Sequence, residues 1–274
     1  MSDHASRLMH SSCSHNEAKP ALPPLDADEA WVLGVNMLFT QAMLLAAGAV
    51  LVLLSTGIAT GEWLEATVGF GWVRVIGDSL AALPLPATLV LGCAAGTLLA
   101  LAAWANERRA LRSEKGRAAV LKARQGINGE LPRLPVPALV ALLVLTGFAE
   151  ELLFRLGMIG LVESLLAGAL PPAAAGAVAL LASSVAFWLA HARYRDPLTS
   201  IVVLALGLAL GGLFMATGSL AVAALAHALY DLAVVLIDRT RMRRDPSFFG
   251  GPAPTRALLD QLEEKERTER PAGE

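Results

Sequence analysis

The sequence predicts an all-α fold, a polytopic transmembrane helical bundle with about six spanning helices. Of its 274 residues, 55% are hydrophobic and only 17% are charged, whereas soluble domains carry about 25% charged residues. The apolar residues form long uninterrupted runs rich in Ala, Leu and Val, and aromatic residues make up only 5% of the chain. Strands of an outer-membrane barrel would instead alternate in hydrophobicity over about ten residues. The composition is therefore that of membrane-spanning helices.

Residues 1–30 are polar and contain several prolines, so we interpret them as a disordered cytoplasmic tail. The first apolar run begins only near Trp31, and we expect no signal peptide. Cys93 lies in an apolar run, so a disulfide between it and the tail cysteine is not expected. The tail also holds histidines, but their spacing with this cysteine fits no metal site. These residues are His4, His10, Cys13 and His15.

Residues 31–134 are predicted to form a two-helix hairpin and a basic cytoplasmic loop. Residues 31–60 carry no charge and are long enough for a span, which needs about 20 residues. Residues 61–80 are mixed and contain aromatic side chains, a composition suited to the membrane interface. The second span covers residues 81–105. Residues 106–134 contain eight basic and three acidic residues, which places this loop in the cytoplasm by the positive-inside rule.

Residues 135–238 hold the remaining apolar runs. The stretch 136–170 would be about 52 Å long as a helix, whereas the hydrocarbon core is about 30 Å thick. We therefore expect a long, tilted or broken helix here, ended by Pro171 and Pro172. Three shorter spans are predicted at residues 173–192, 198–216 and 219–238.

Residues 239–274 are predicted to form a basic juxtamembrane segment and a cytoplasmic tail, with a surface helix over 254–268. Four arginines lie between residues 239 and 244, and Arg193 and Arg195 follow the fourth span. Six crossings with both termini in the cytoplasm place every basic cluster on the same side. The Ala- and Arg-rich composition and the absence of an Asn-x-Ser/Thr sequon favour an integral protein of a bacterial plasma membrane.

The strongest functional signal is a set of ionisable residues inside the apolar runs. Glu150, Glu151 and Arg155 lie within six residues of one run. A charge at the centre of a membrane helix costs about 2.5–3.5 kcal/mol for Asp, Lys or Arg, so such residues need partners or a function. The candidate partners in later runs are His191, His227 and Asp231.

Helical spacing indicates which of these side chains share a face. Glu151 and Arg155 are four residues apart and can pair within the helix. Glu150 points about 100° away from its neighbour and is free to face the bundle interior. The same four-residue spacing relates two further pairs, Phe187 with His191 and His227 with Asp231.

A carboxylate beside imidazoles in a membrane cavity suits two versions of peptide hydrolysis. The carboxylate can act as a general base on water, while His and Asp or a metal stabilise the oxyanion. Two histidines and a carboxylate also form a reasonable zinc ligand set with a position open for water. The residues alone do not choose between these versions.

Three motifs together resemble the CPBP family of intramembrane metalloproteases, which includes CAAX prenyl endopeptidases and Abi-type, bacteriocin-processing or self-immunity proteins. The resemblance covers about residues 135–238. The motifs are Glu150-Glu151-x-x-x-Arg155, Phe187-x-x-x-His191, and the glycine-rich stretch 211–220 that leads to His227-x-x-x-Asp231.

The resemblance implies a role for the first two motifs. Glu150 looks like the glutamate that activates the attacking water, and His191 looks like the residue that assists it. Glu151 and Arg155 look like a structural pair that holds their helix in place. Phe187 looks like a further support of the site.

The third motif looks like the pair that stabilises the oxyanion or binds a metal, through His227 and Asp231. The last position is more often Asn in this family, and an ionised Asp cannot donate a hydrogen bond. Asp231 therefore favours metal ligation or orientation of His227. The family also often has Gly where this chain has Leu156. If a divalent metal is present, zinc is expected, and its ligands would be Glu150, His191, His227 and Asp231.

These observations predict an intramembrane endopeptidase that hydrolyses a peptide bond of a membrane-associated or membrane-delivered substrate. Its expected partners are a peptide or protein substrate and membrane lipid, with no nucleic acid. If the protein is bacterial, a prenylated substrate is not expected. The alternative is a non-catalytic scaffold, immunity or assembly protein on the same fold. A transporter or proton relay is disfavoured, because the two halves show no inverted repeat.

Overall fold

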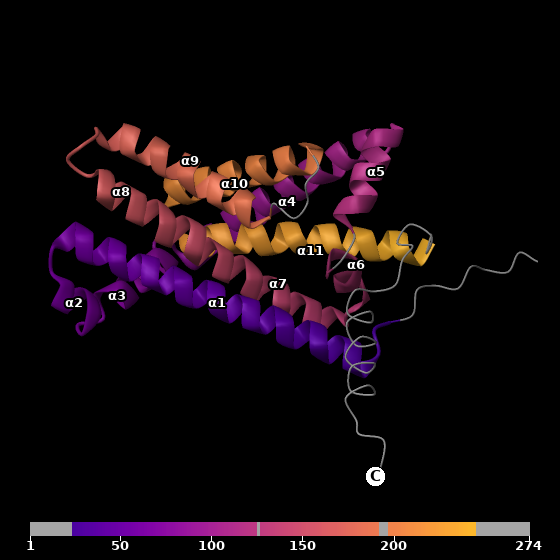
Figure 1. The fold of residues 1–274 in the computed structure, drawn as a ribbon, viewed down its shortest axis with the longest axis horizontal. Coiled ribbons are helices and arrows are strands. Elements are labelled where there is room, and N and C mark those ends of the chain that lie inside the picture. The colour runs from indigo at the N-terminus through magenta and orange to yellow at the C-terminus, as the bar shows by residue number, and fades with distance from the viewer. Residues whose placement is uncertain (1–23, 125–126, 192–196, 245–274) are drawn as a thin grey trace, which may run out of the picture.

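The computed structural model describes residues 24–124, 127–191 and 197–244, and in these ranges the chain forms helices and no β-strand. Among these residues, six helices are long and apolar enough to cross a membrane, which confirms the predicted fold class (Figure 1). They are α1 (Ala27–Thr60), α4 (Leu85–Ala110), the continuous helix Val136–Leu166, α9 (Pro172–Ala190), α10 (Pro197–Thr217) and α11 (Leu220–Arg244).

Several predictions concern residues outside the described ranges. They are the tail residues 1–23 with their three histidines and Cys13, the arginines Arg193 and Arg195, and the surface helix at 254–268. These stay predictions. Cys93 is described, and its side chain is an exposed free thiol on α4.

Helix α1 begins before the apolar run that predicted it. The Asp26 carboxylate accepts a hydrogen bond from the backbone N–H of Glu29 at 2.8 Å, and the Glu29 carboxylate accepts one from the N–H of Asp26 at 3.2 Å. This reciprocal arrangement is a capping box, which satisfies backbone donors at a helix start. Assigning residues 27–30 to a disordered tail was therefore wrong. Hydropathy misses this polar first turn, because the cap rather than apolar burial specifies it.

The helix that carries the two glutamates changes its winding directly after them. It consists of α7 (Val136–Glu151), the π-helical segment η2 (Leu152–Ile159) and α8 (Gly160–Leu166). Single-turn π-helical segments are frequent at functional sites, and this one spans eight residues. The helix ends at Leu166, four residues before the predicted end, and Gly168 follows with a φ of 81°. Glycine adopts this left-handed conformation at no steric cost.

Glycines let α1 approach η2 closely. A Cβ atom added at Gly48 would lie 3.0 Å from the backbone nitrogen of Leu153, and one added at Gly157 would lie 3.0 Å from Cβ of Leu51. Both distances are shorter than ordinary van der Waals contact, so larger side chains would push the helices apart. The close approach holds the segment after the two glutamates against α1.

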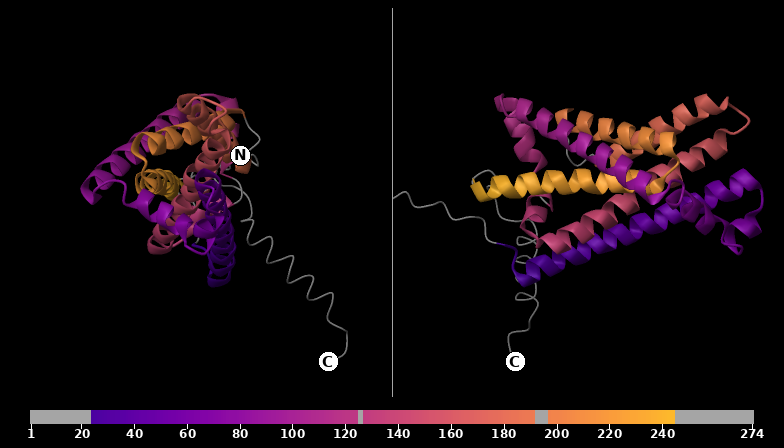
Figure 2. Two further views of the ribbon diagram at one scale, coloured as in Figure 1. Left: turned by 90° about the vertical axis from the view of Figure 1, so that its left-hand side faces the viewer. Right: turned by 180° about the vertical axis from the view of Figure 1, so that it is seen from behind.

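Helix α11 occupies the middle of the bundle, where it packs on α4, α7 and α10, while α1 runs along the α7–α8 helix and α9 packs on α10 (Figures 1 and 2). Two glycines of α4 lie against α11. A Cβ at Gly96 would be 2.8 Å from the carbonyl oxygen of Ala226, and one at Gly92 would be 2.7 Å from the Leu225 side chain. Small residues permit such close packing between membrane helices.

The outer surface of the bundle is strongly apolar. Large side chains along the spans are 66–68% exposed, among them Phe39, Val90, Leu98 and Ile201. Exposed apolar surface of this extent is costly in water. Together with the six apolar helices, it shows an integral membrane protein.

The short helices lie at the two ends of the bundle (Figure 1). One end carries α2 (Trp63–Thr67) and α3 (Gly71–Leu80). There the Ser79 hydroxyl donates to the carbonyl of Gly218 at 3.0 Å and accepts from the N–H of Leu220 at 3.1 Å. The opposite end, called here the basic end, is formed by α5 (Glu114–Ala123), α6 (Ile127–Glu130), η1 (Leu131–Arg133) and the last turns of α4 and α11.

Candidate active site

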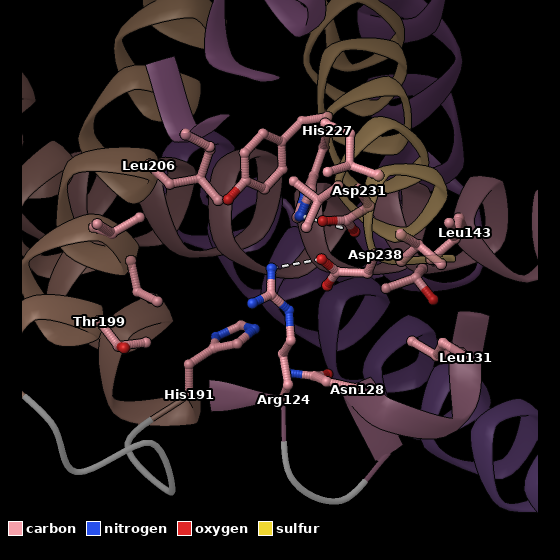
Figure 3. A pocket seen from close by; sticks show the side chains of 18 of the residues that line it. Arg124, Asn128, Leu131, Leu143, His191, Thr199, Leu206, His227, Asp231 and Asp238 are labelled. Carbon is pink, nitrogen blue, oxygen red and sulfur yellow. Dashed lines mark hydrogen bonds and ion pairs between the residues drawn. The ribbon is translucent and has the colours of Figure 1, made fainter. Parts of the chain in front are cut away.

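Five of the predicted site residues, the four ionisable ones named below and Phe187, line one cavity of about 440 Å³ inside the bundle (Figure 3). Glu150 comes from the end of α7, and His191 directly follows the last residue of α9. His227 and Asp231 lie one turn apart on α11. The structure thus brings together residues from three helices that are up to 81 positions apart in the sequence.

Both imidazoles face the same carboxylate oxygen. Glu150 Oε2 lies 3.9 Å from His191 Nε2 and 3.9 Å from His227 Nε2. These separations are too long for direct hydrogen bonds, and contacts of this length are commonly bridged by water. A water molecule about 2.8 Å from each of two atoms fits between atoms separated by 3.9 Å. The Glu150 side chain is 12% exposed and the His191 side chain 29%, while Glu150 Oε2 itself is buried and has no hydrogen-bond partner among the described residues.

The hydrogen bonds of the two histidines determine which ring nitrogen faces Glu150. His191 Nδ1 lies 2.8 Å from the carbonyl oxygen of Phe187. A carbonyl oxygen only accepts, so Nδ1 carries the proton and Nε2 presents its lone pair to the cavity. His227 Nδ1 lies 2.8 Å from Glu151 Oε1 and donates to that carboxylate. Each ring is therefore held by Nδ1, and its Nε2 lies on the side that faces Glu150.

Glu151 points away from the cavity into the protein interior. Its side chain and that of Arg155 are both 0% exposed, and Arg155 Nε lies 2.9 Å from Glu151 Oε2. Arg155 Nη1 also donates to the Ser183 hydroxyl at 3.3 Å, and that hydroxyl donates to the carbonyl of Phe154 at 2.6 Å. The resemblance assigned Glu151 to a structural pair, and the structure adds a direct bond from this pair to His227.

Phe187 forms an apolar surface beneath both histidines. Its side chain is 1% exposed, and its ring centroid is 4.5 Å from that of His191 and 5.9 Å from that of His227. The guanidinium of Arg155 lies over the same ring, 4.9 Å from its centroid. A cation over an aromatic face is attracted by the ring quadrupole. Phe187 therefore packs against the guanidinium of Arg155 and against both imidazoles.

Asp231 does not make the orienting contact that the sequence analysis considered for it. Its Oδ2 lies 3.6 Å from His227 Nε2, the nitrogen that faces the cavity. Nδ1 of this histidine is bonded to Glu151 instead. The side chain of Asp231 is 24% exposed, so it shares the open part of the site with Glu150 and His191.

A network of charged residues that the sequence analysis did not single out lines the basic end of the same cavity. Arg124 donates hydrogen bonds to Glu107 and Asp238, and Arg241 also pairs with Glu107. Figure 3 shows the guanidinium of Arg124 directed at Asp238. The network joins the ends of α4, α5 and α11 along one wall of the cavity.

Arg124 stays charged in this network. Burial alone would lower the pKa of its guanidinium, but hydrogen bonds to Asp238 and Glu107 and their negative charges raise that pKa above its ordinary value. In the sequence, Arg124 stands out only as a basic residue of the loop 106–134. The available signal was Asp238, an acidic residue at the end of an apolar run that needs a cation nearby.

The donor types at the site suit zinc, and as positioned here the donor atoms lie slightly farther apart than the ligands of one ion. The separations of 3.6–3.9 Å between neighbouring donor atoms exceed the roughly 3.3 Å expected between two ligands at about 2.0 Å from a tetrahedral zinc ion. Among the described residues, no three His, Cys, Asp or Glu side chains are grouped closely enough to hold a metal ion. The expected zinc ion stays a prediction.

Comparison with known proteins gives one match. Residues 132–233 match the family model described as type II CAAX prenyl endopeptidase Rce1-like. No curated protein and no solved structure matches the chain. The matched segment runs from η1 into α11 and contains all seven predicted site residues, whereas Glu107, Arg124 and Asp238 lie outside it. The match confirms the resemblance to this group of membrane proteases, in that residues 132–233 carry an Rce1-like domain of the type II CAAX prenyl endopeptidase kind.

Proposed function

We propose that this protein is an intramembrane endopeptidase that hydrolyses a peptide bond with a water molecule activated by Glu150. The main support is the position of two histidine Nε2 atoms, each 3.9 Å from one oxygen of Glu150 in a cavity inside the bundle. The family match supports protease activity in general. The roles of the individual residues are our inference from geometry.

In the proposed reaction Glu150 acts first as a base and then as an acid. It takes a proton from water while the water oxygen attacks the substrate carbonyl carbon. His191 Nε2, which presents a lone pair, accepts a hydrogen bond from the same water and orients it. The tetrahedral intermediate then collapses, the carbon–nitrogen bond breaks, and Glu150 returns its proton to the leaving amine.

His227 is proposed to stabilise the negative oxygen of the tetrahedral intermediate. In its imidazolium form, His227 donates from Nδ1 to Glu151 and carries a second proton on Nε2, which can donate to that oxygen. Donors fixed in advance stabilise developing charge without reorganising during the reaction. Asp231, 3.6 Å from the same Nε2, is proposed to stabilise the imidazolium form of His227 electrostatically.

The proposed substrate is a peptide or protein that reaches the cavity from the membrane or from the basic end. The family name refers to CAAX substrates with a prenyl group. Our proposal is limited to the peptide, since the residues that line the site are those of peptide-bond hydrolysis. Membrane lipid surrounds the apolar outer face.

A resident zinc ion is a separate proposal with its own test. If zinc is bound, its ligands would come from Glu150, His191, His227 and Asp231, and it would polarise the substrate carbonyl or activate the water. The test is the metal content of the purified protein and of a His227→Ala variant. One zinc per chain in the wild type that is lost in the variant would support this version.

The deciding experiment compares cells that carry the wild type with matched cells that carry Glu150→Gln. New peptide termini in membrane fractions are mapped by mass spectrometry, and the folding of both proteins is checked by thermal unfolding in detergent. Termini found only with the wild type support the proposal and identify the substrate. If both sets of termini agree while the variant is folded, the catalytic proposal fails. If this variant also restores the normal phenotype to cells that lack the protein, a non-catalytic scaffold, immunity or assembly role becomes the better proposal.

A further inference from the structure

Two buried polar side chains line the catalytic cavity and have no assigned role. Gln41 on α1 is 3% exposed and Thr146 on α7 is 8% exposed. Both line the cavity that contains Glu150. Neither Gln41 Oε1 nor Thr146 Oγ1 has a hydrogen-bond partner among the described residues. Other buried hydroxyls of the bundle do have partners, such as that of Ser183.

Unpaired buried oxygens of this kind are unusual and costly. A buried polar group without a hydrogen bond destabilises a protein, and the large majority of such groups in native structures are paired. Most threonines in membrane helices satisfy their hydroxyl on a carbonyl of the preceding turn, and Thr40 does so here by donating to the carbonyl of Asn36. Thr146 does not. Its hydroxyl is therefore available to a molecule that enters the cavity.

The spacing of Thr146 from Glu150 along α7 suits a bound peptide. Thr146 precedes Glu150 by four residues, so the two share one face of α7 and differ in height by about 6 Å along its axis. An extended peptide advances by about 3.3 Å per residue. A substrate chain that runs along this face would therefore place the residue about two positions from the cleaved bond next to Thr146. Gln41 joins this wall from α1, which packs on α7.

The chemistry of these side chains matches a peptide backbone. An amide and a hydroxyl both donate and accept hydrogen bonds and carry no charge, so they suit the alternating N–H and C=O groups of an extended chain rather than a charged group. We propose that Gln41 and Thr146 bind the substrate backbone beside the cleaved bond, with Gln41 Oε1 accepting from a substrate N–H and the Thr146 hydroxyl bonding to a substrate C=O. This inference rests on the proposed endopeptidase function.

The arrangement has a consequence for specificity. Contacts to the backbone do not depend on the identity of the substrate side chains, so these residues would hold many sequences in an extended conformation. Thr146 precedes Glu150 in α7, so this pair would direct the substrate chain along the wall between Glu150 and the start of α7. Folded or helical segments, whose backbone groups are already paired, would be poor substrates.

The test uses Thr146→Val and Gln41→Met, which preserve approximate volume while removing the polar group. The matched controls are Thr146→Ser, which keeps the hydroxyl, and Thr40→Val, which removes a hydroxyl that is already paired within its helix. The probe is a synthetic peptide that spans a cleavage site mapped in wild-type cells. A second version of this peptide carries N-methyl groups at single backbone positions. Kinetics and thermal unfolding are measured on the full chain in detergent.

The expected result is a KM raised about three- to tenfold by each apolar variant, the effect of one lost hydrogen bond, with kcat changed less than twofold. Both controls should keep the wild-type KM. The apolar variants should unfold at the same temperature as the wild type or higher, because an unpaired buried group has been removed. N-methylation at one position should raise the wild-type KM but have little further effect in Gln41→Met.

Three results would overturn the inference. They are an unchanged KM in both apolar variants, an equal rise in KM for Thr40→Val, or a lower unfolding temperature that accounts for the lost activity. These results leave the proposed function intact as long as the wild type cleaves the peptide. If the wild type cleaves no peptide at all, the proposed function itself fails and this inference falls with it.

Discussion

Replacing Arg155 with methionine should strongly destabilise the protein, although Arg155 does not line the cavity. The guanidinium is 0% exposed and contacts Glu151 at 2.9 Å, Ser183 at 3.3 Å and the ring of Phe187 at 4.9 Å from its centroid. Arg155→Met leaves the Glu151 carboxylate buried with only His227 as a partner. Removing one member of a buried ion pair costs about 3–5 kcal/mol, and we expect a loss of this size.

The comparison with a double variant separates charge from packing. Replacing a buried ion pair by apolar residues of similar volume is often neutral, so Glu151→Leu with Arg155→Met should recover at least about 1 kcal/mol relative to Arg155→Met alone. The measurement is equilibrium unfolding of the purified proteins in mixed detergent micelles. The double variant should still lose peptide cleavage, because His227 Nδ1 has lost its acceptor. A cost below about 1 kcal/mol for Arg155→Met would refute the assignment of Arg155 as the charge that compensates Glu151.

Three further predictions concern packing and polar contacts, each checked by the same unfolding measurement. Gly96→Ala should destabilise the protein by about 1–3 kcal/mol, because its Cβ would lie 2.8 Å from a backbone oxygen of α11. The control is Gly34→Ala, where the added Cβ meets nothing within 4 Å. This control should be neutral or slightly stabilising. Ser183→Ala should cost about 1–3 kcal/mol, because it removes the partner of a buried carbonyl and of Arg155. Arg124→Met should cost about 2–3 kcal/mol, because it leaves two carboxylates that line the cavity short of a cation; an unchanged stability would show that the contacts of Arg124 do not stabilise the fold.

The sequence was sufficient for the six spanning helices and for naming the ionisable residues that the structure brings to one cavity. Uninterrupted apolar runs are an unambiguous signal in a membrane, since every spanning segment must satisfy its own backbone hydrogen bonds. Charged residues inside such runs are equally informative, because only a partner or a function offsets their cost. For this reason Glu150, His191, His227 and Asp231 could be named together before any of their distances was known.

The sequence could not reveal contacts that depend on how one helix is rotated against another. The bond between Glu151 and His227 joins residues 76 positions apart, and it exists because α11 turns that histidine towards α7. Four-residue spacing instead suggested Asp231 as the partner of His227. The roles of Gln41 and Thr146 were also hidden, because a single uncharged polar residue in an apolar run is commonly satisfied within its own helix. Their unpaired oxygens become visible only in three dimensions.

The adjacent glutamates illustrate how one short motif can serve two environments. Successive side chains on a helix point about 100° apart. Two adjacent glutamates at the edge of a cavity can therefore direct one carboxylate into the cavity and the other into the protein interior. Glu151 is 0% exposed and bonded to Arg155 and His227, while Glu150 is 12% exposed and faces two imidazole nitrogens across the cavity. Glu151 fixes the ring of His227, and Glu150 faces that same ring. The two acids are therefore coupled through His227, and a change at Glu151 should alter the chemistry at Glu150 even though only Glu150 touches the cavity.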